Sequence, residues 1–369
     1  MTKTKKILLI VTLLLIATFG LFGCGKRGLD FSKPPKDNKE QNKPQKQNPT
    51  KDDEIDKLFD MEKIEGGYAI KKYKSTEPQP EPDLPDPGLP GDFPEGFAGY
   101  TNDIKIPSEY KGEKVIKIGD GAFEGNNLVG KVELPNTITE IGEGAFADCS
   151  NLQSITLNEG LKKIGKYAFY RTSITKLDFP KTVEEIGEAI CDACKRLEST
   201  TLNEGLKEIS DSAFRGTMLK SVSIPKSVAR VGFEAFSDCE KLQEVTFEEG
   251  LTKIDDYAFS KTKVSSITMP KTVEEIGEGA FENCSALKTL TLNEGLKKIG
   301  MQAFRATSIS SLTIPSSVTE IEERAFARSK NLSEINCEVK SKPEKWHDLW
   351  NLKEKKNQDK IMYDVKWKA

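Results

Sequence analysis

The chain has 369 residues, long enough for two average domains or for one repeat array, and its 55 Lys and Arg nearly balance its 58 Asp and Glu. The formal net charge of −3 predicts no nucleic-acid partner, because such binding depends on an excess of cations. The single histidine, His347, argues against an enzyme or a metal site, since Ser-His-Asp, Cys-His and multi-histidine centres need imidazole, and we expect no cofactor.

The first 23 residues have the pattern of a secretion signal peptide. Lys3, Lys5 and Lys6 precede an apolar run of 15 residues, Ile7–Leu21, which is shorter than the roughly 20 residues that a membrane-spanning helix needs. The Leu-Phe-Gly-Cys sequence that ends at Cys24 resembles a bacterial lipobox, which implies cleavage before Cys24 and lipidation of this cysteine. The alternative is an uncleaved anchor that contains a cysteine by chance. We expect a secreted chain that the lipid on Cys24 anchors to a membrane, at the cell surface or outer membrane of a bacterium.

Residues 24–97 are expected to separate the anchor from the rest of the chain. Lys, Asn, Gln and Pro dominate the first part, so we predict a disordered tether over residues 24–60. An N-terminal extension covers residues 61–97 and contains a Pro-rich segment, which is either a second linker or a long loop. The spacing of apolar residues predicts a short amphipathic helix over Asp52–Glu65, and Tyr68–Tyr73 is predicted as a strand.

A repeat of 22 or 23 residues fills residues 98–339 and predicts a solenoid of about ten turns. In each turn a pattern such as Leu152-x-x-Ile155-x-Leu157 predicts a short parallel strand. An Ala-Phe pair follows, expected on a short helical or 3₁₀ segment opposite the strand, and Cys191 takes the place of Phe once. Residues 340–369 are expected to form a C-terminal cap. The recurring phenylalanines are Phe123, Phe146, Phe169, Phe214, Phe236, Phe259, Phe281, Phe304 and Phe326.

The repeat is a doublet of 45 residues, because prolines such as Pro180 alternate with Asn or Glu at the end of the strand. The string Ile-Gly-x-x-Ala-Phe-x-x-Cys-x-x-Leu-x-x-Ile-x-Leu-Pro resembles the BspA-type (Treponema-type) leucine-rich repeats of bacterial surface lipoproteins, over about residues 98–337. The resemblance implies an α/β repeat solenoid, a leucine-rich-repeat horseshoe with one short parallel strand per turn. It also implies protein-protein binding and adhesion to extracellular-matrix or cell-surface proteins of a host.

Cys149, Cys194, Cys239 and Cys284 recur every 45 residues, and Thr takes the equivalent position in the alternate turns. Stacked turns lie about 4.8 Å apart, so cysteines two turns apart are near 10 Å, beyond the roughly 7 Å limit for a disulfide. We therefore predict that these cysteines fill small buried spaces. Cys191 and Cys194 form a C-x-x-C sequence, but both fall on scaffold positions, so packing is a better account than redox or zinc chemistry.

One outward position of each predicted strand forms a polar column, which would line the concave surface of the leucine-rich-repeat horseshoe that the resemblance implies. Thr is common in exposed strands by propensity alone, so the column is either plain scaffold or a polar surface for an extended protein or glycan partner. It lacks the Trp, Tyr and Arg of tight sites, which predicts weak or multivalent binding. The candidate binding residues are Thr156, Asp178, Thr201, Ser223, Thr246, Thr268, Thr291 and Thr313.

Three tryptophans, Trp346, Trp350 and Trp367, lie near the C-terminus. They are either an exposed binding patch or a cover for the open end of the core, and the second interpretation is favoured because a terminal turn must be capped.

The functional hypothesis is a monomeric, surface-exposed, lipid-anchored bacterial protein that binds proteins and adheres to host matrix or cells. The alternative is an envelope scaffold that binds the organism's own proteins or cell-wall glycan. Fold alone does not decide between them.

Overall fold

The computed structural model describes residues 49–74, 102–356 and 359–369. The predicted signal peptide, Cys24 and the Pro-rich segment lie outside the described residues. Within these residues no helix is long and apolar enough to cross a membrane.

The folded unit begins with helix α1 (Lys51–Leu58), whose first turn is capped by reciprocal hydrogen bonds between Thr50 and Asp53. Strand β1 (Phe59–Ile64) follows directly and pairs antiparallel with β2 (Gly67–Tyr73). The strand predicted over Tyr68–Tyr73 is therefore confirmed. The helix predicted over Asp52–Glu65 is wrong beyond Leu58, because pairing with β2 holds the second half of that segment in an extended conformation.

The tether predicted to reach residue 60 is also too long. Ile55 and Phe59 are buried in the core, so residues 51–60 belong to the folded unit. Phe59 lies 5.6 Å from Tyr73 and 6.3 Å from Phe123, measured between ring centroids. Aromatic contacts thus join this segment to the first repeat.

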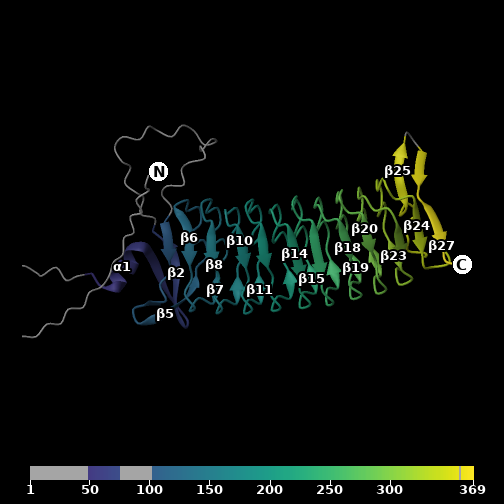
Figure 1. Cartoon of the computed structure of the whole chain (residues 1–369). Coiled ribbons are helices and arrows are strands. Elements are labelled where there is room, and N and C mark those ends of the chain that lie inside the picture. The colour runs from purple at the N-terminus through teal and green to yellow at the C-terminus, as the bar shows by residue number, and fades with distance from the viewer. Residues whose placement is uncertain (1–48, 75–101, 357–358) are drawn as a thin grey trace, which may run out of the picture. The chain divides into compact units, whose positions relative to one another are not determined.

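Each repeat contributes one strand to a first face, which we call the strand face (Figure 1). Neighbouring strands of successive turns pair in parallel, mostly two by two. The strands of this face are β3 (Asn102–Lys105), β6 (Val129–Glu133), β8 (Ser154–Thr156), β10 (Lys176–Asp178), β12 (Ser199–Thr201), β14 (Ser221–Ile224), β16 (Glu244–Phe247), β18 (Ser266–Thr268), β20 (Thr289–Thr291), β22 (Leu312–Ile314), β24 (Glu334–Cys337) and β27 (Asp364–Trp367).

A second face is built from two-residue strands that continue from β2 and β5 (Glu113–Ile118). At the edge of this face β4 (Glu109–Tyr110) pairs antiparallel with β5, and a separate antiparallel pair is formed by β25 (Leu352–Lys356) and β26 (Asp359–Met362). The second-face strands are β7 (Glu140–Ile141), β9 (Lys163–Ile164), β11 (Glu185–Ile186), β13 (Glu208–Ile209), β15 (Arg230–Val231), β17 (Lys253–Ile254), β19 (Glu275–Ile276), β21 (Lys298–Ile299) and β23 (Glu320–Ile321).

The third side of each turn carries the Ala-Phe pair and forms turns in place of the expected short helical or 3₁₀ segments. Tyr257 and Lys261, which flank Phe259, have left-handed backbones with φ of 57° and 61°. The N–H groups of Tyr257 and Phe259 donate to the carbonyls of Glu278 and Ala280 in the next turn, both at 2.8 Å. A helix would use these N–H groups internally, whereas here they join successive turns. The result is the predicted repeat solenoid of leucine-rich type, with little helix.

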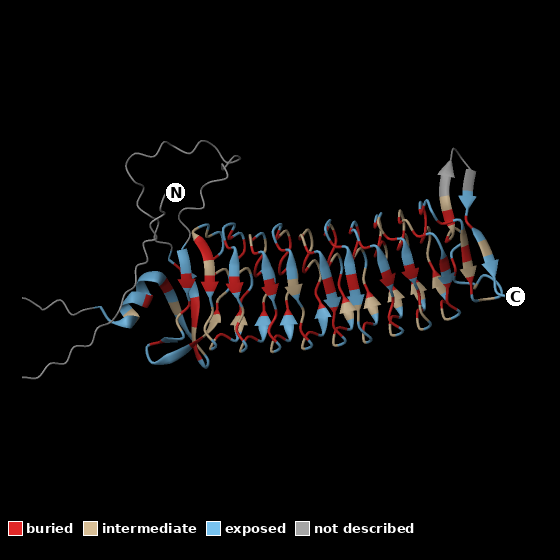
Figure 2. Cartoon of the chain, in the orientation of Figure 1, coloured by how far each residue is buried: buried red, intermediate tan, exposed pale blue. Residues whose placement is uncertain are grey.

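A stack of aromatic rings runs through the core between the two faces, and Figure 2 shows buried residues alternating with exposed ones along the strands. Phe236, Phe259 and Phe281 are fully buried, with successive ring centroids 5.2 Å apart. Stacking the turns removes these rings from water, which a single turn cannot do.

The stack is interrupted at Cys191, as its position in the repeat predicts. The pairing of the second face also stops between β11 and β13, on either side of this residue. Beyond this residue the ring of Phe214 is contacted edge-on by Phe179, with 6.2 Å between the ring centroids. The turn around Cys191 is therefore the irregular point of the solenoid.

The C-terminal end of the core is covered by tryptophan, which confirms the capping interpretation for two of the three residues. Trp346 and Trp350 are buried and lie 4.8 Å apart, and the Trp346 indole N–H donates to the carbonyl of Val318 at 3.3 Å. Trp367 remains 36% exposed at the end of β27.

Candidate binding face

The strand face presents alternate residues to the solvent because successive side chains of a strand point to opposite sides. In β18, Ile267 is buried in the core, whereas Ser266 and Thr268 are exposed. The same pattern holds in β20, where Leu290 points inward. Core packing of the apolar residue therefore fixes the orientation of the polar ones.

All eight predicted binding residues are exposed on this face, one per turn. The register places Asp178 beside Thr201, and Thr268 beside Thr291, on paired strands. The structure thus brings the predicted column together as a continuous row.

A second outward column, two residues earlier in each strand, was not identified from the sequence. Its members are less uniform than the threonine column, but strand alternation alone would have found them, since residues i and i+2 share a face. In the six turns from β12 to β22 the two columns together form what we call the hydroxyl array. Its members are Ser199, Thr201, Ser221, Ser223, Thr246, Ser266, Thr268, Thr289, Thr291, Ser311 and Thr313.

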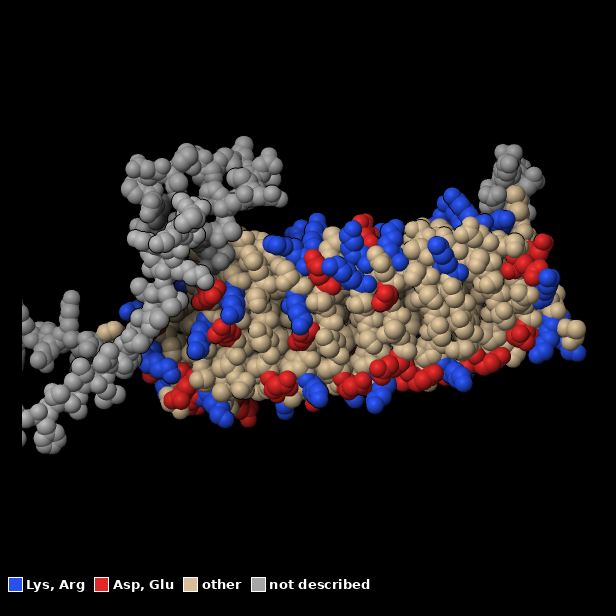
Figure 3. All heavy atoms as spheres, in the orientation of Figure 1, with Lys and Arg blue, Asp and Glu red and all other residues tan. Residues whose placement is uncertain are grey.

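The hydroxyl array is nearly free of charge. Of the twelve outward positions in those six turns, only Glu244 is charged, although charged residues make up 31% of the chain. Figure 3 shows a largely uncharged middle band between charged upper and lower edges. No described hydroxyl of the array makes a side-chain hydrogen bond within the chain. Each one is available to donate to, and accept from, a partner.

The N-terminal part of the same face carries paired charges instead. The Nζ of Lys131 lies 2.8 Å from Oε1 of Glu133, and the Nζ of Lys176 lies 2.6 Å from Oδ2 of Asp178. The hydrogen bond from Lys131 lowers the pKa of the Glu133 carboxyl, which stays ionised. The strand face therefore has two chemically different parts.

The cysteines of the repeat are buried and free, as the packing interpretation predicts. The thiol of Cys239 donates to the carbonyl of Phe214 at 3.1 Å and contacts the hydroxyl of Thr217 at 3.2 Å. Burial raises the pKa of the Cys239 thiol to about 11, which opposes formation of a reactive thiolate. Burial likewise raises the pKa of Cys191.

The described residues contain no group of three or more His, Cys, Asp and Glu side chains able to hold a metal ion. His347 is exposed, and its Nδ1 accepts a hydrogen bond from the backbone N–H of Leu349 at 3.0 Å. The repeated acids form ion pairs between turns, such as Glu185 with Lys163 at 2.8 Å and Glu274 with Lys297 at 2.7 Å. Such exposed pairs are a solvated surface rather than an acid-base site.

Comparison with known proteins supports the resemblance. A family model described as BspA type leucine rich repeat region, in six copies, matches residues 116–239 and 207–333. No curated protein matches the chain.

Several bacterial structures are similar to this chain. A leucine-rich cell surface protein from Faecalibacterium prausnitzii has 24% identity and a TM-score of 0.41, covering 76% of this chain and 86% of that chain. A leucine-rich repeat protein from Bacteroides ovatus has 23% identity and a TM-score of 0.45, covering 79% and 88%. The pneumococcal vaccine antigen PcpA has 19% identity and a TM-score of 0.49, covering 76% and 80%.

Proposed function

Because the chain belongs to the family of BspA-type leucine-rich repeat proteins, we propose that it is a lipid-anchored bacterial surface protein that adheres to host matrix or host cells. Repeats of this type are interaction scaffolds, so the proposal includes protein binding and no catalytic activity. The signal peptide and Cys24 support export and anchoring. The partners are extracellular-matrix or cell-surface proteins of the host.

The observation that carries the proposal is the hydroxyl array. A row of exposed, hydrogen-bonding side chains on stacked, paired strands offers an extended surface to a partner. Because the array lacks large aromatic anchors, its affinity comes from many weak contacts rather than from a few strong ones.

Replacing Thr246 and Thr291 by Arg tests this binding face. Two long cations in the middle of the array interrupt its contacts, so we expect binding to a panel of immobilised matrix proteins and to host cells to weaken by about tenfold, roughly 1.4 kcal/mol. Both positions are exposed, so the thermal unfolding midpoint stays unchanged.

The matched control replaces Thr252 and Thr319 by Arg. These two threonines are also exposed, but they precede strands of the second face. This variant is expected to bind as the unmodified chain does. Equal loss in both variants, or no binding of the unmodified chain to any matrix protein or cell, would refute the proposal.

A further inference from the structure

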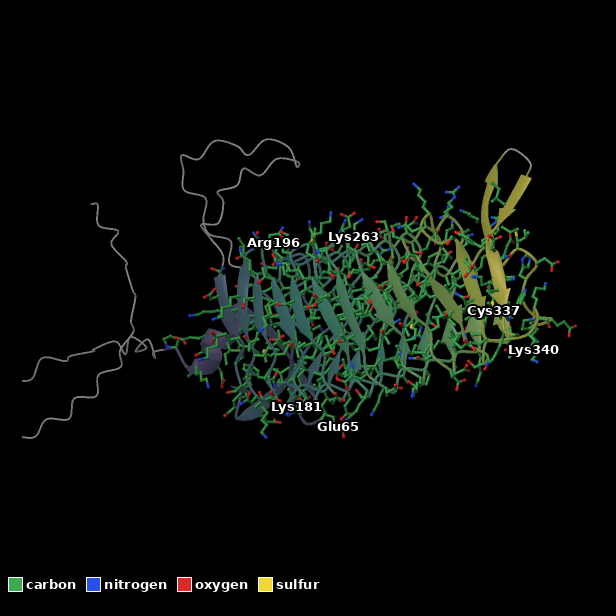
Figure 4. The ribbon with its side chains drawn as sticks, turned by 45° about the vertical axis from the view of Figure 1, so that its right-hand side comes forward. Glu65, Lys181, Arg196, Lys263, Cys337 and Lys340 are labelled. Atoms are coloured by element: carbon green, nitrogen blue, oxygen red, sulfur yellow. The ribbon has the colours of Figure 1, made fainter. Side chains whose placement is uncertain are left out.

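A row of cations follows the edge where each turn enters the strand face. The structure places at least one on each of five consecutive turns, and all are exposed. Figure 3 shows Lys and Arg gathered along the upper edge of the molecule, and Figure 4 shows Arg196 and Lys263 at that edge. We call this row the basic ridge, and its members are Lys195, Arg196, Lys220, Lys241, Lys263 and Lys288.

The ridge is positive although the whole chain has a net charge of −3. Three acids, Glu198, Glu240 and Glu244, lie along the same edge, so six cations against three acids leave a charge of +3. Lys220 pairs with Glu198 at 2.6 Å, and its hydrogen bond lowers the pKa of that carboxyl. Among the described residues, the other five cations have no ion-pair partner within 4.0 Å.

The opposite edge of the strand face, where the chain leaves each strand, carries no excess of positive charge. Its charges alternate in sign from turn to turn, because Lys follows the Pro-type strands and Glu follows the Asn-type strands. The residues are Glu159, Lys181, Glu204, Lys226, Glu249, Lys271 and Glu294. The excess of positive charge is thus a property of one edge only.

The basic ridge borders the hydroxyl array directly. Lys220 immediately precedes Ser221, and Lys288 immediately precedes Thr289. Turns repeat about every 4.8 Å, so the five turns of the ridge place cations along roughly 19 Å, parallel to the array. A partner that lies along the ridge therefore also meets a row of hydroxyl groups.

We propose that the ridge and the array together bind an extended polyanionic polysaccharide that carries sulfate or carboxylate groups. The cations pair with the anionic groups of the polymer, and the hydroxyls exchange hydrogen bonds with its sugar rings. A nucleic acid fits less well, because single strands bind through aromatic stacking and no position of the array is aromatic. The inference rests on the proposed function because both use the strand face. It adds that the ligand of this face is an anionic glycan.

The test measures binding of the mature chain to immobilised heparin, used as the sulfated polysaccharide probe, at several salt concentrations. Replacing Lys241, Lys263 and Lys288 by Gln removes three ridge cations without breaking an ion pair among the described residues. We expect the affinity for heparin to fall at least about tenfold and the slope of log affinity against log salt to decrease by about two.

The matched control replaces Lys181, Lys226 and Lys271 by Gln on the opposite edge. It changes the net charge equally, and we expect heparin binding close to that of the unmodified chain. Circular dichroism and thermal unfolding confirm that both variants fold. Equal loss in the two variants would mean that net charge alone drives binding, and it would overturn the inference.

Two further probes identify the chemistry of the ligand. We expect desulfated heparin and neutral dextran to bind much more weakly than heparin. Tighter binding to single-stranded DNA or inorganic polyphosphate than to heparin would overturn the assignment to a polysaccharide.

Failure of the glycan inference and failure of the proposed adhesion give different results. In one outcome heparin does not bind, matrix proteins do bind, and replacing Thr246 and Thr291 by Arg weakens the binding of matrix proteins. The inference then fails and the proposed function stands. If heparin binds but no matrix protein or host cell does, the proposed adhesion fails and the glycan site stands.

Discussion

Single buried rings contribute much of the stability of this solenoid. Phe259 is fully buried, and its ring is nearly parallel to those of Phe236 and Phe281, with interplanar angles of 6° and 9°. Each ring packs against the next, so removing one ring leaves a cavity and deprives both neighbouring rings of a packing contact. At one position of the stack the smaller residue Cys191 takes the place of Phe.

Replacing Phe259 by Ala should lower the free energy of unfolding by about 3–5 kcal/mol, the range for a buried Phe truncation. Denaturant unfolding followed by circular dichroism measures the loss. Cys191→Ala at the equivalent position is the control and should cost less, because fewer atoms are removed. A negligible loss for Phe259→Ala would mean that the register of the repeat is wrong.

At the scale of the element, a glycine directly after a second-face strand lets successive turns pack closely against each other. A Cβ on Gly187 would lie 2.3 Å from the backbone nitrogen of Lys166 and 2.5 Å from the carbonyl carbon of Gly165. These are backbone atoms of the preceding turn, which cannot move without disturbing the pairing of β9 with β11. The glycine that follows the inward Ile is therefore a stacking requirement at this turn.

Gly187→Ala should destabilise the protein by about 1–3 kcal/mol, as overpacking does elsewhere. The control is Gly125→Ala, where an added Cβ meets no atom within 4 Å and only the left-handed backbone, with φ of 69°, is strained. Thermal and denaturant unfolding compare the two. If Gly125→Ala costs as much, close contact between turns is not the cause.

At the scale of the whole molecule, the solenoid is closed at both ends and open on its faces. Tyr73 stacks on Phe123 at 5.2 Å at one end, and Trp350 lies 6.4 Å from Phe326 at the other. Aromatic residues therefore cover both ends of the core, and the polar strand face between them stays exposed to solvent.

The anchoring hypothesis is tested on the full chain. Cys24→Ala removes the proposed lipidation site, so we expect the protein to move from the detergent phase to the aqueous phase in a Triton X-114 partition. Unchanged partitioning would contradict the lipid anchor. Protease added to intact cells checks exposure, and an uncut protein would favour the envelope-scaffold alternative.

The sequence by itself determined the solenoid, its strand period, the buried cysteines and the threonine column. Each depends on side chains that recur every 22 or 23 residues, and stacking forces equivalent positions into one row. The end of α1 at Leu58 was not predictable from local pattern, because pairing with β2 overrides helical spacing.

Only the tertiary structure decided the basic ridge. Arg196, Lys220, Lys241, Lys263 and Lys288 stand 24, 21, 22 and 25 residues apart, close to the repeat period. The sequence therefore places each of them before a strand, but it does not show that these segments form one exposed edge beside the hydroxyl array. Folding brings them to one edge because each falls in the short segment that leads into a strand, and that segment occupies the same place in every turn. A chain whose total charge is −3 thereby acquires a local positive surface beside its hydroxyl array.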